Sequence, residues 1–316
     1  MKRLASIDIG TNTALLLAAE VSPQLEILPL VQHEKIVRLG EGVDERRLLK
    51  PAAIQRTMEA LEEYVKECRD LKIEDIVISG TSAVRDAQNR AELIDEIKQV
   101  FGIEMRVLSG EEEARLTYFG ALSNKSHLTH DILLIDIGGG STEFITGTLN
   151  AITKAVSIDV GSVRLTERFI RHDPINEAEF SAIENFIDKQ LRSIRRNFAF
   201  RPEHFVGVAG TVTTLAAMQL RMADYNPEKV DSCHLNFQQV TEMVEDLKRK
   251  SLSEKRHLPG LSPKRADVIL AGAMILLQVM REFDFVEVTV SDRGLRFGVL
   301  IDFAKNIFLP QSLRKH

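Results

Sequence analysis

The stretch LASIDIGTNT, residues 4–13, and the stretch LLIDIGGGST, residues 133–142, share the letters Ile-Asp-Ile-Gly. In each, an aspartate (Asp8 or Asp136) lies at the end of a hydrophobic run and is followed by Ile-Gly and a short loop of small residues. A strand that ends in a glycine-containing turn exposes backbone N–H groups and lets an anion approach closely. The repeat therefore predicts two similar phosphate-binding loops.

The same order of elements surrounds both stretches. In the first half, the pattern predicts strands at 3–9, 13–21, 25–31 and 34–39, a helix from Pro51, a strand at 75–81, a helix at 90–101, a strand at 104–108 and a helix from 110–111. In the second half, it predicts strands at 132–137, 141–147 and 151–158, helices at 161–170 and 176–198, and a strand that enters a Gly-Thr turn within 205–217. The Gly80-Thr81 and Gly210-Thr211 turns are then counterparts as well. Two such repeats predict two similar α/β domains that face each other.

The domain boundary is expected in the polar segment SNKSHLTHD, residues 123–131. We therefore place the first domain at 1–124 and the second at 125–316, with a last helix at about 293–308 that can cross back to the first. The most apolar segment, VILAGAMILLQVM, is too short to span a bilayer and is predicted to be a buried helix.

Composition excludes several classes of protein. The chain has 316 residues, 44% of them hydrophobic, and a net charge of −5, which gives no general attraction to nucleic acid or to a membrane. Its two cysteines, Cys68 and Cys233, have no metal-ligand spacing and are expected to be free thiols. The N-terminus has no long apolar run of the kind found in signal peptides, so a cytoplasmic location is expected.

Three loops, DIGTNT, DIGGGSTE and VAGTVTTLA, resemble the phosphate loops of the actin, sugar-kinase and heat-shock-chaperone superfamily. Further segments narrow the resemblance to the exopolyphosphatase and guanosine-pentaphosphate phosphatase family: SGTSAVRDAQN (79–89), SGEEEARLTYFGA (109–121), IDIGGGSTEF (135–144), PGLSPKRADVILAG (259–272) and SDRGLRFGVL (291–300). They follow the family's order over nearly the whole chain. The resemblance implies two ribonuclease-H-like domains with a cleft between them, in a short form that lacks the C-terminal helical region of larger members.

The resemblance also implies the chemistry: Mg²⁺-dependent hydrolysis of terminal phosphates from inorganic polyphosphate, with Mn²⁺ as an alternative metal. Glu113 resembles the catalytic base, and Glu143 resembles the second acidic residue, which helps place the water or the metal. Asp136 lies at the tip of its strand and is expected to bind Mg²⁺, with Glu143 as the other metal ligand. Carboxylates crowded at a helix start can have a raised pKa, which suits a base. The residues alone do not separate Glu112 from Glu113; the resemblance selects Glu113.

Arg85 resembles the family's phosphate-binding arginine, and a guanidinium fits two phosphate oxygens at once. The structural alternative is a salt bridge with Asp86 or Glu92. The other predicted substrate-binding residues are Asp8, Gly10, Thr11, Asn12, Gly138, Gly139, Gly140, Ser141, Thr142, Gly210, Thr211, Arg256 and Arg265. The last two belong to the basic stretch 248–265, which is either a track for a long polyanion or a solvated helix end and loop.

Three other functions stay open at this point. The closest is 5′-phosphohydrolysis of guanosine pentaphosphate at the same site. An ATP-dependent kinase or actin-like ATPase would need an adenosine-binding Gly-Gly loop, of which VAGTVT is a poor version. The third is a sensor that binds polyphosphate or an alarmone without cutting it, and the intact Glu113, Asp136 and Glu143 argue against it. The resemblance implies a homodimer, and neither nucleic acid nor membrane is expected as a partner.

Overall fold

The computed structural model describes residues 1–195 and 202–308, and the chain forms two compact units. Unit 1 comprises Met1–Ser123 and the chain from Gly294 onward, and unit 2 comprises Asn124–Arg293. The last helix, α13 (Leu295–Phe308), therefore belongs to unit 1.

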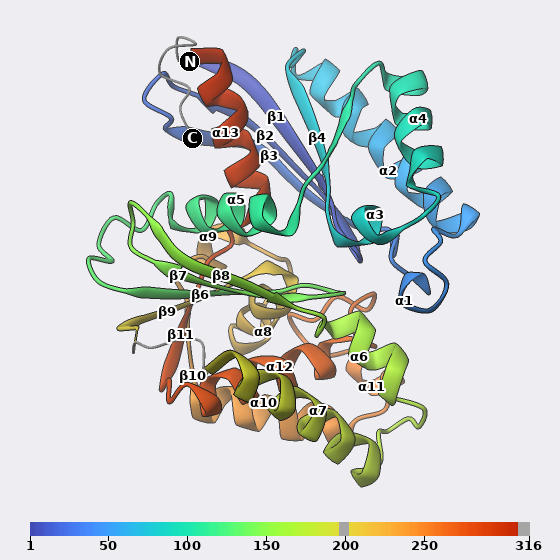
Figure 1. Ribbon diagram of the computed structural model, residues 1–316, viewed down its shortest axis with the longest axis vertical. Helices are drawn as coiled ribbons and strands as arrows, with labels where there is room; N and C mark the ends of the chain where they lie inside the picture. The colour runs from blue at the N-terminus through green and yellow to red at the C-terminus, as the bar shows by residue number, and fades with distance from the viewer. Residues whose placement is uncertain (196–201, 309–316) are drawn as a thin grey trace. The chain divides into compact units, whose positions relative to one another are not determined.

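Unit 1 is built on a mixed five-stranded sheet in the order β3-β2-β1-β4-β5 (Figure 1). The strands are β1 (Lys2–Ile9), β2 (Thr13–Val21), β3 (Ile27–Ile36), β4 (Ile76–Gly80) and β5 (Met105–Val107). The first three run antiparallel, β4 is parallel to β1, and β5 is parallel to β4. A single strand β3 replaces the two expected at 25–31 and 34–39. Its polar middle does not end it, because β3 is an edge strand that pairs with β2 along its whole length.

Alternation along β1 directs its side chains to two different cores. Ala5, Ile7 and Ile9 pack in one core with α2 (Pro51–Asp70) and α4 (Arg90–Phe101), and Leu4 packs on the other face with α13. The short helices of this unit are α1 (Val43–Arg46) and α3 (Ser82–Asp86). Helix α5 (Gly110–Leu122) joins α13 through Leu116 and Val299.

Two glycines let α5 and α13 approach closely. A Cβ added at Gly298 would lie 1.8 Å from the carbonyl oxygen of Leu116, and one added at Gly120 would lie 2.4 Å from the carbonyl oxygen of Gly294. Only glycine permits a backbone contact of this kind. The close contact fixes the position of α5, whose first turn carries the Glu111-Glu112-Glu113 run.

Unit 2 repeats the topology of unit 1 and adds an edge strand. Its sheet has the order β10-β11-β9-β6-β7-β8. The strands are β6 (Ile132–Ile137), β7 (Thr142–Gly147), β8 (Ile152–Ile158), β9 (His204–Val208), β10 (His234–Asn236) and β11 (Glu287–Val290). Strands β6 to β8 run antiparallel, whereas β9 is parallel to β6 and β11 to β9. The predicted pair of ribonuclease-H-like α/β domains is confirmed.

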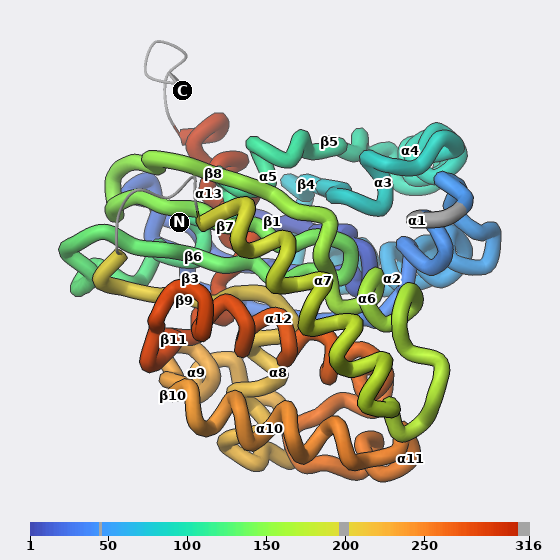
Figure 2. Tube along the Cα trace, turned by 60° about the horizontal axis from the view of Figure 1, so that its bottom comes forward, coloured from blue at the N-terminus to red at the C-terminus, as the bar shows by residue number. Residues whose placement is uncertain are grey.

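One buried helix lies at the centre of the core of unit 2, and Figure 2 shows its path. Helix α12 (Ile269–Glu282), expected at 268–280, is buried at every residue from Ile269 to Met280. It packs in one core with α6, α7, α8 and α10. The helices of unit 2 besides α12 are α6 (Ser162–Phe169), α7 (Glu177–Arg195), α8 (Ala209–Gln219), α9 (Pro227–Val230), α10 (Phe237–Arg249) and α11 (Leu252–Lys255). The expected helix 176–198 corresponds to α7, and its last three residues lie outside the described ranges. Across the described residues, no helix is long and apolar enough to cross a membrane.

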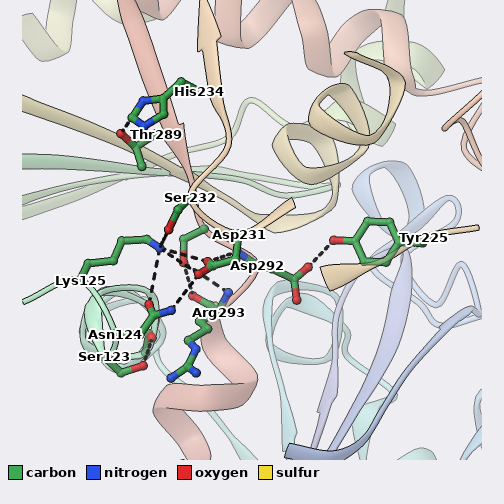
Figure 3. Close-up of polar contacts among 12 residues, drawn as sticks. Ser123, Asn124, Lys125, Tyr225, Asp231, Ser232, His234, Thr289, Asp292 and Arg293 are labelled. Carbon is green, nitrogen blue, oxygen red and sulfur yellow. Dashed lines mark hydrogen bonds and ion pairs between the residues drawn. The ribbon is translucent and has the colours of Figure 1, made fainter. Parts of the chain in front are cut away.

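A buried lysine ties the two ends of unit 2 together (Figure 3). Lys125 is fully buried, and its Nζ donates to both carboxylate oxygens of Asp231, at 3.1 and 3.2 Å, and to the Ser232 hydroxyl. Asp231 also accepts from the Asn124 side chain and from the backbone N–H of Asp292. The first two residues of unit 2 and its next-to-last residue are thus bound to one carboxylate.

Candidate active site

The turn after β1 is closed by one backbone hydrogen bond, from the N–H of Gly10 to the carbonyl of Thr13 at 2.8 Å. The carbonyl of Thr11 accepts from the N–H of Gly40 at 2.8 Å, and the carbonyl of Asn12 accepts from two N–H groups that follow β3. The turn carbonyls therefore face the segment after β3, which holds the predicted loop Gly10–Asn12 in place.

The second predicted loop of unit 1 lies beside the first. The N–H of Thr81 donates to the carbonyl of Ile9 at 3.1 Å, and the hydroxyls of Thr11 and Ser82 are hydrogen-bonded at 2.9 Å. Helix α3 begins directly after this turn and carries Arg85. The structure thus brings the Asp-Ile-Gly loop and the loop that positions Arg85 together within unit 1.

Glu113 lies at the start of α5 and is almost entirely buried, with 11% of its side chain exposed. Its Oε2 accepts a hydrogen bond of 2.7 Å from Nη1 of Arg85. Burial raises the pKa of the Glu113 carboxyl, and the Arg85 hydrogen bond opposes that rise only in part. A buried carboxylate with a raised pKa has the properties of a general base.

Glu112 has a different environment from its neighbour. It completes a capping box in which Ser109 accepts from the N–H of Glu112, and the Glu112 carboxylate accepts from the N–H of Ser109. Its other oxygen accepts from Arg106 at 2.9 Å. The Arg106 hydrogen bond, followed by those of Ser109, lowers the pKa of Glu112 to about 2. The geometry therefore separates the two glutamates: Glu112 caps the helix, and Glu113 is the candidate base.

Asp8 is the second buried carboxyl of unit 1. It is 7% exposed, and its Oδ1 is buried without a hydrogen-bond partner among the described residues. Burial, and then the negative charge of Glu113, raise the pKa of Asp8 to about 7, against the opposing charge of Arg296. Asp8 and Glu113, which are 105 positions apart in the printed sequence, thus influence each other's ionisation.

The glycine loop of unit 2 is closed in the same way as the loop of unit 1. The N–H of Gly138 donates to the carbonyl of Ser141 at 3.0 Å. The carbonyls of Gly138, Gly139 and Gly140 accept hydrogen bonds from the start of α6: the first from Ser162, the second from two backbone N–H groups and the third from Nε of Arg164 at 2.7 Å. No described backbone carbonyl accepts from the N–H groups of Gly139, Gly140 or Ser141. These three N–H groups are therefore suited to an anion.

Two predicted metal ligands lie side by side across β6 and β7. Asp136 pairs directly with Glu143, and Glu143 pairs with Ser157 of β8. Directly opposed residues share one face of a sheet. Glu143 is 4% exposed, and its Oε1 accepts from the Ser157 hydroxyl at 2.7 Å. Mg²⁺ is usually bound through one or two carboxylates, with waters and substrate phosphates as the other ligands, so this donor set fits it. Three-residue metal clusters of His, Cys, Asp and Glu do not occur among the described residues.

The Gly210-Thr211 pair lies within a helix, which corrects the predicted turn. Helix α8 begins at Ala209, directly after β9, so both residues belong to its first turn. Ala209 has φ of +65°, a left-handed conformation in which a side chain is strained. A Cβ added at Gly210 would lie 1.9 Å from Nη1 of Arg265, so the Arg265 guanidinium packs directly on this glycine. The structure thus joins the predicted residues Gly210 and Arg265.

Other predicted substrate contacts have different surroundings. Thr142 is fully buried and its hydroxyl donates to the carbonyl of Val160, so its side chain supports the loop. Arg256 is exposed. Within the basic stretch, Lys248 pairs with Glu177 at 2.9 Å and Lys255 is buried. Arg249 and Lys250 pair with acidic residues one helical turn earlier. Much of that stretch is therefore neutralised locally.

Sequence reasoning missed four residues that build the site. Ser82 binds the hydroxyl of Thr11, Arg164 binds the glycine loop, Ser157 binds Glu143, and Ala209 is the strained residue before Gly210. All four are placed by strand register or by contacts between segments that are distant in the sequence. The Ser109-x-x-Glu112 spacing of a capping box was the one local signal that could have separated Glu112 from Glu113.

Known proteins resemble this chain along almost its whole length. A protein named bifunctional 3-dehydroquinate synthase/phosphatase, from Fusobacterium nucleatum, is 34% identical over 96% of this chain, and the chain spans 46% of that protein. Exopolyphosphatase 2 of Mycobacterium tuberculosis is 31% identical over 96% of this chain and 99% of that protein.

Solved structures agree with the fold. An exopolyphosphatase from Cytophaga hutchinsonii has a TM-score of 0.89 at 30% identity, covering 96% of this chain and 98% of that one. A Ppx/GppA family member from Aquifex aeolicus has a TM-score of 0.82 at 31% identity, covering 97% and 98%. The sequence model of the Ppx/GppA phosphatase family matches residues 17–307. The chain belongs to the Ppx/GppA phosphatase family.

Proposed function

We propose that this chain is an exopolyphosphatase, which hydrolyses the terminal phosphoanhydride bond of inorganic polyphosphate. The observation that carries the proposal is Glu113, a buried carboxylate with a raised pKa that is hydrogen-bonded to Arg85. The similarity to Exopolyphosphatase 2 of M. tuberculosis over 99% of that protein supports the choice of substrate.

In the proposed reaction, water attacks the terminal phosphorus, and the bond from that phosphorus to the bridging oxygen breaks. The water's proton passes to Glu113, inorganic phosphate is released, and a polyphosphate shorter by one unit leaves. Phosphoryl transfer depends mainly on positioning and on neutralising charge. Arg85 and the N–H groups of Gly139, Gly140 and Ser141 are suited to hold phosphate oxygens.

We propose Mg²⁺ as the cofactor, with Mn²⁺ able to replace it. Asp136 and Glu143 would hold the ion, because they are opposed carboxylates on one face of neighbouring strands. Bound there, the ion would supply positive charge against phosphate oxygens. The hydroxyl of Ser157 orients Glu143 for this task.

We also propose that the protein is a cytoplasmic homodimer. Its two free thiols, Cys68 and Cys233, support a reducing compartment, and the family resemblance supports the dimer. Cell fractionation tests the location. Light scattering coupled to size-exclusion chromatography tests the dimer, and a monomer mass would contradict it.

The test of function is phosphate release with Mg²⁺ from long polyphosphate, tripolyphosphate, guanosine pentaphosphate and ATP in parallel. We expect release from the polyphosphates that disappears in Glu113→Gln. Release from guanosine pentaphosphate alone would instead assign a 5′-phosphohydrolase of that nucleotide. Binding of polyphosphate without release from any substrate would identify a sensor.

A further inference from the structure

The contacts of Arg85 divide its guanidinium into two edges. Nη1 donates to the carbonyl of Leu108 at 3.1 Å and to Oε2 of Glu113 at 2.7 Å, so both of its hydrogens are engaged. Among the described residues, Nη2 donates no hydrogen bond, and Nε has only a 4.0 Å contact with Asp86. The side chain is 27% exposed. The Nε–Nη2 edge is therefore open to a ligand while Nη1 is engaged.

The engaged edge has a rigid anchor. Leu108 is fully buried, and its N–H donates to the carbonyl of Gly80 at 2.9 Å, so its own carbonyl has a fixed position. The backbone of Arg85 is fixed as well, because its N–H donates to the carbonyl of Thr81. An arginine held at both its backbone and Nη1 has little freedom to turn. Its remaining pair of parallel N–H groups matches two oxygens of a phosphate.

We propose that Arg85 is a positioning residue for Glu113 as well as a phosphate ligand, because Nη1 holds the carboxylate while the Nε–Nη2 edge holds the terminal phosphate. One planar guanidinium then sets how far the carboxylate lies from the phosphorus that water attacks. This inference rests on the proposed function for its chemistry, and it gives Arg85 a role that phosphate binding alone does not require.

The charges around Glu113 give the proposal a pH signature. Asp8 from β1 and Asp86 from α3 present negative charge to it, Arg85 presents positive charge, and Arg296 from α13 acts on Asp8. Removing the cation raises the pKa of Glu113, so the base would take its proton at a higher pH. In Arg85→Gln, the acid limb of the kcat profile should move up by about one pH unit or more.

Kinetics separate positioning from simple binding. Arg85→Lys keeps a positive charge, but a single ammonium group cannot span both partners. We expect kcat with tripolyphosphate to fall on the order of 100-fold, with a much smaller change in KM. Free guanidinium ion should restore part of the kcat of Arg85→Ala. The matched control is Arg69→Lys, at an exposed arginine on α2, which should behave as wild type. A higher KM at unchanged kcat in Arg85→Lys would overturn the positioning role.

A crystal structure of the full chain with tripolyphosphate, grown without divalent cations, tests the same point without turnover. We expect Nη1 to stay on Glu113 while Nε and Nη2 contact one phosphate. Nη1 turned away from Glu113 onto the phosphate would overturn the inference. If the wild-type chain releases no phosphate from polyphosphate, the proposed function fails, and this structure still decides whether one guanidinium holds both groups.

Discussion

The Asp-Ile-Gly turns of the two units share their backbone hydrogen bonds but differ in the side chains that surround their aspartates. The closing hydrogen bond joins Gly10 to Thr13 at 2.8 Å in unit 1 and Gly138 to Ser141 at 3.0 Å in unit 2. In both, the turn carbonyls accept from the segment that follows the third strand of the sheet. The backbone arrangement of the turn is therefore repeated.

The neighbours of the aspartates differ. Asp136 is opposite Glu143 on the next strand, whereas Asp8 is opposite the apolar Leu15. Unit 2 therefore has a carboxylate pair suited to a cation. In unit 1 the single buried aspartate instead lies near Glu113 of α5. The residue opposite the aspartate therefore distinguishes the two turns, because it is a second carboxylate in unit 2 and a leucine in unit 1.

The largest expected effect comes from removing the carboxylate that distinguishes unit 1. Glu113→Gln should lower phosphate release on the order of 1,000-fold, because an amide cannot accept the water's proton. The matched control is Glu112→Gln, which keeps a capping-box side chain but loses the ion pair with Arg106, and which should reduce stability by about 1 kcal/mol or less while leaving most activity. Phosphate-release assays and thermal melts of both variants measure this, and equal losses of activity would contradict the assignment.

The second change makes unit 2 resemble unit 1. Glu143→Leu places a leucine opposite Asp136, as Leu15 lies opposite Asp8 in unit 1. Activity with Mg²⁺ should fall on the order of 100-fold, because one of the two carboxylates is lost. Ser157→Ala removes only the hydroxyl that orients Glu143 and should cost about tenfold. Steady-state rates at fixed Mg²⁺ rank the two variants. A Glu143→Leu enzyme with wild-type activity would show that the pair is not a metal site.

The third prediction concerns the unpaired aspartate of unit 1. The pKa of Asp8 is raised from 3.8 to about 7 by folding, so its destabilisation is absent below about pH 4, grows between pH 4 and 7, and is complete above pH 7. Asp8→Asn removes the charge. Above pH 7 the variant should be more stable than wild type by up to roughly 4 kcal/mol, since one pKa unit corresponds to about 1.4 kcal/mol.

Urea unfolding at pH 4, 7 and 9 measures this difference, with Asp70→Asn at an exposed position as the control. Parallel stability curves for wild type and Asp8→Asn would contradict the prediction.

The smallest expected effect is the loss of stability on substituting the glycines that pack against the two turns. A Cβ at Gly161 would lie 2.3 Å from the backbone oxygen of Gly139, whereas a Cβ at Gly40 would meet the Thr11 methyl group at 2.3 Å. A side chain can turn away and a backbone cannot. Gly161→Ala should therefore destabilise by about 1–3 kcal/mol, and Gly40→Ala by less. Thermal melts compare them, and the reverse order would show that the loops differ in rigidity.

Much of the fold could be predicted because its signals are local. The helix expected at 90–101 is α4, and both Asp-Ile-Gly turns fall where an apolar run meets glycine. The pairing of Asp136 with Glu143 depends on strand register, which a short tight turn fixes.

The rest depends on tertiary structure. The left-handed conformation of Ala209 gives no signal in the sequence, because that conformation usually belongs to glycine. The Gly210-Thr211 pair that follows it was therefore predicted to form a turn. Arg164 reaches Gly140 across 24 positions of sequence. Asp8 meets the charge of Glu113 because α13 packs on the face of β1 that carries Leu4 and Ser6, and α5 packs on α13. No spacing in the sequence predicts these contacts between distant residues.

The most direct test is a Mg²⁺ titration of phosphate release from tripolyphosphate with wild type, Glu113→Gln and Glu143→Leu. If unit 1 supplies the base and unit 2 the metal carboxylates, Glu113→Gln will lose rate at an unchanged half-saturating Mg²⁺ concentration. Glu143→Leu will require on the order of tenfold more Mg²⁺ or greater. A shifted Mg²⁺ requirement in Glu113→Gln, or an unchanged one in Glu143→Leu, would contradict this division of roles.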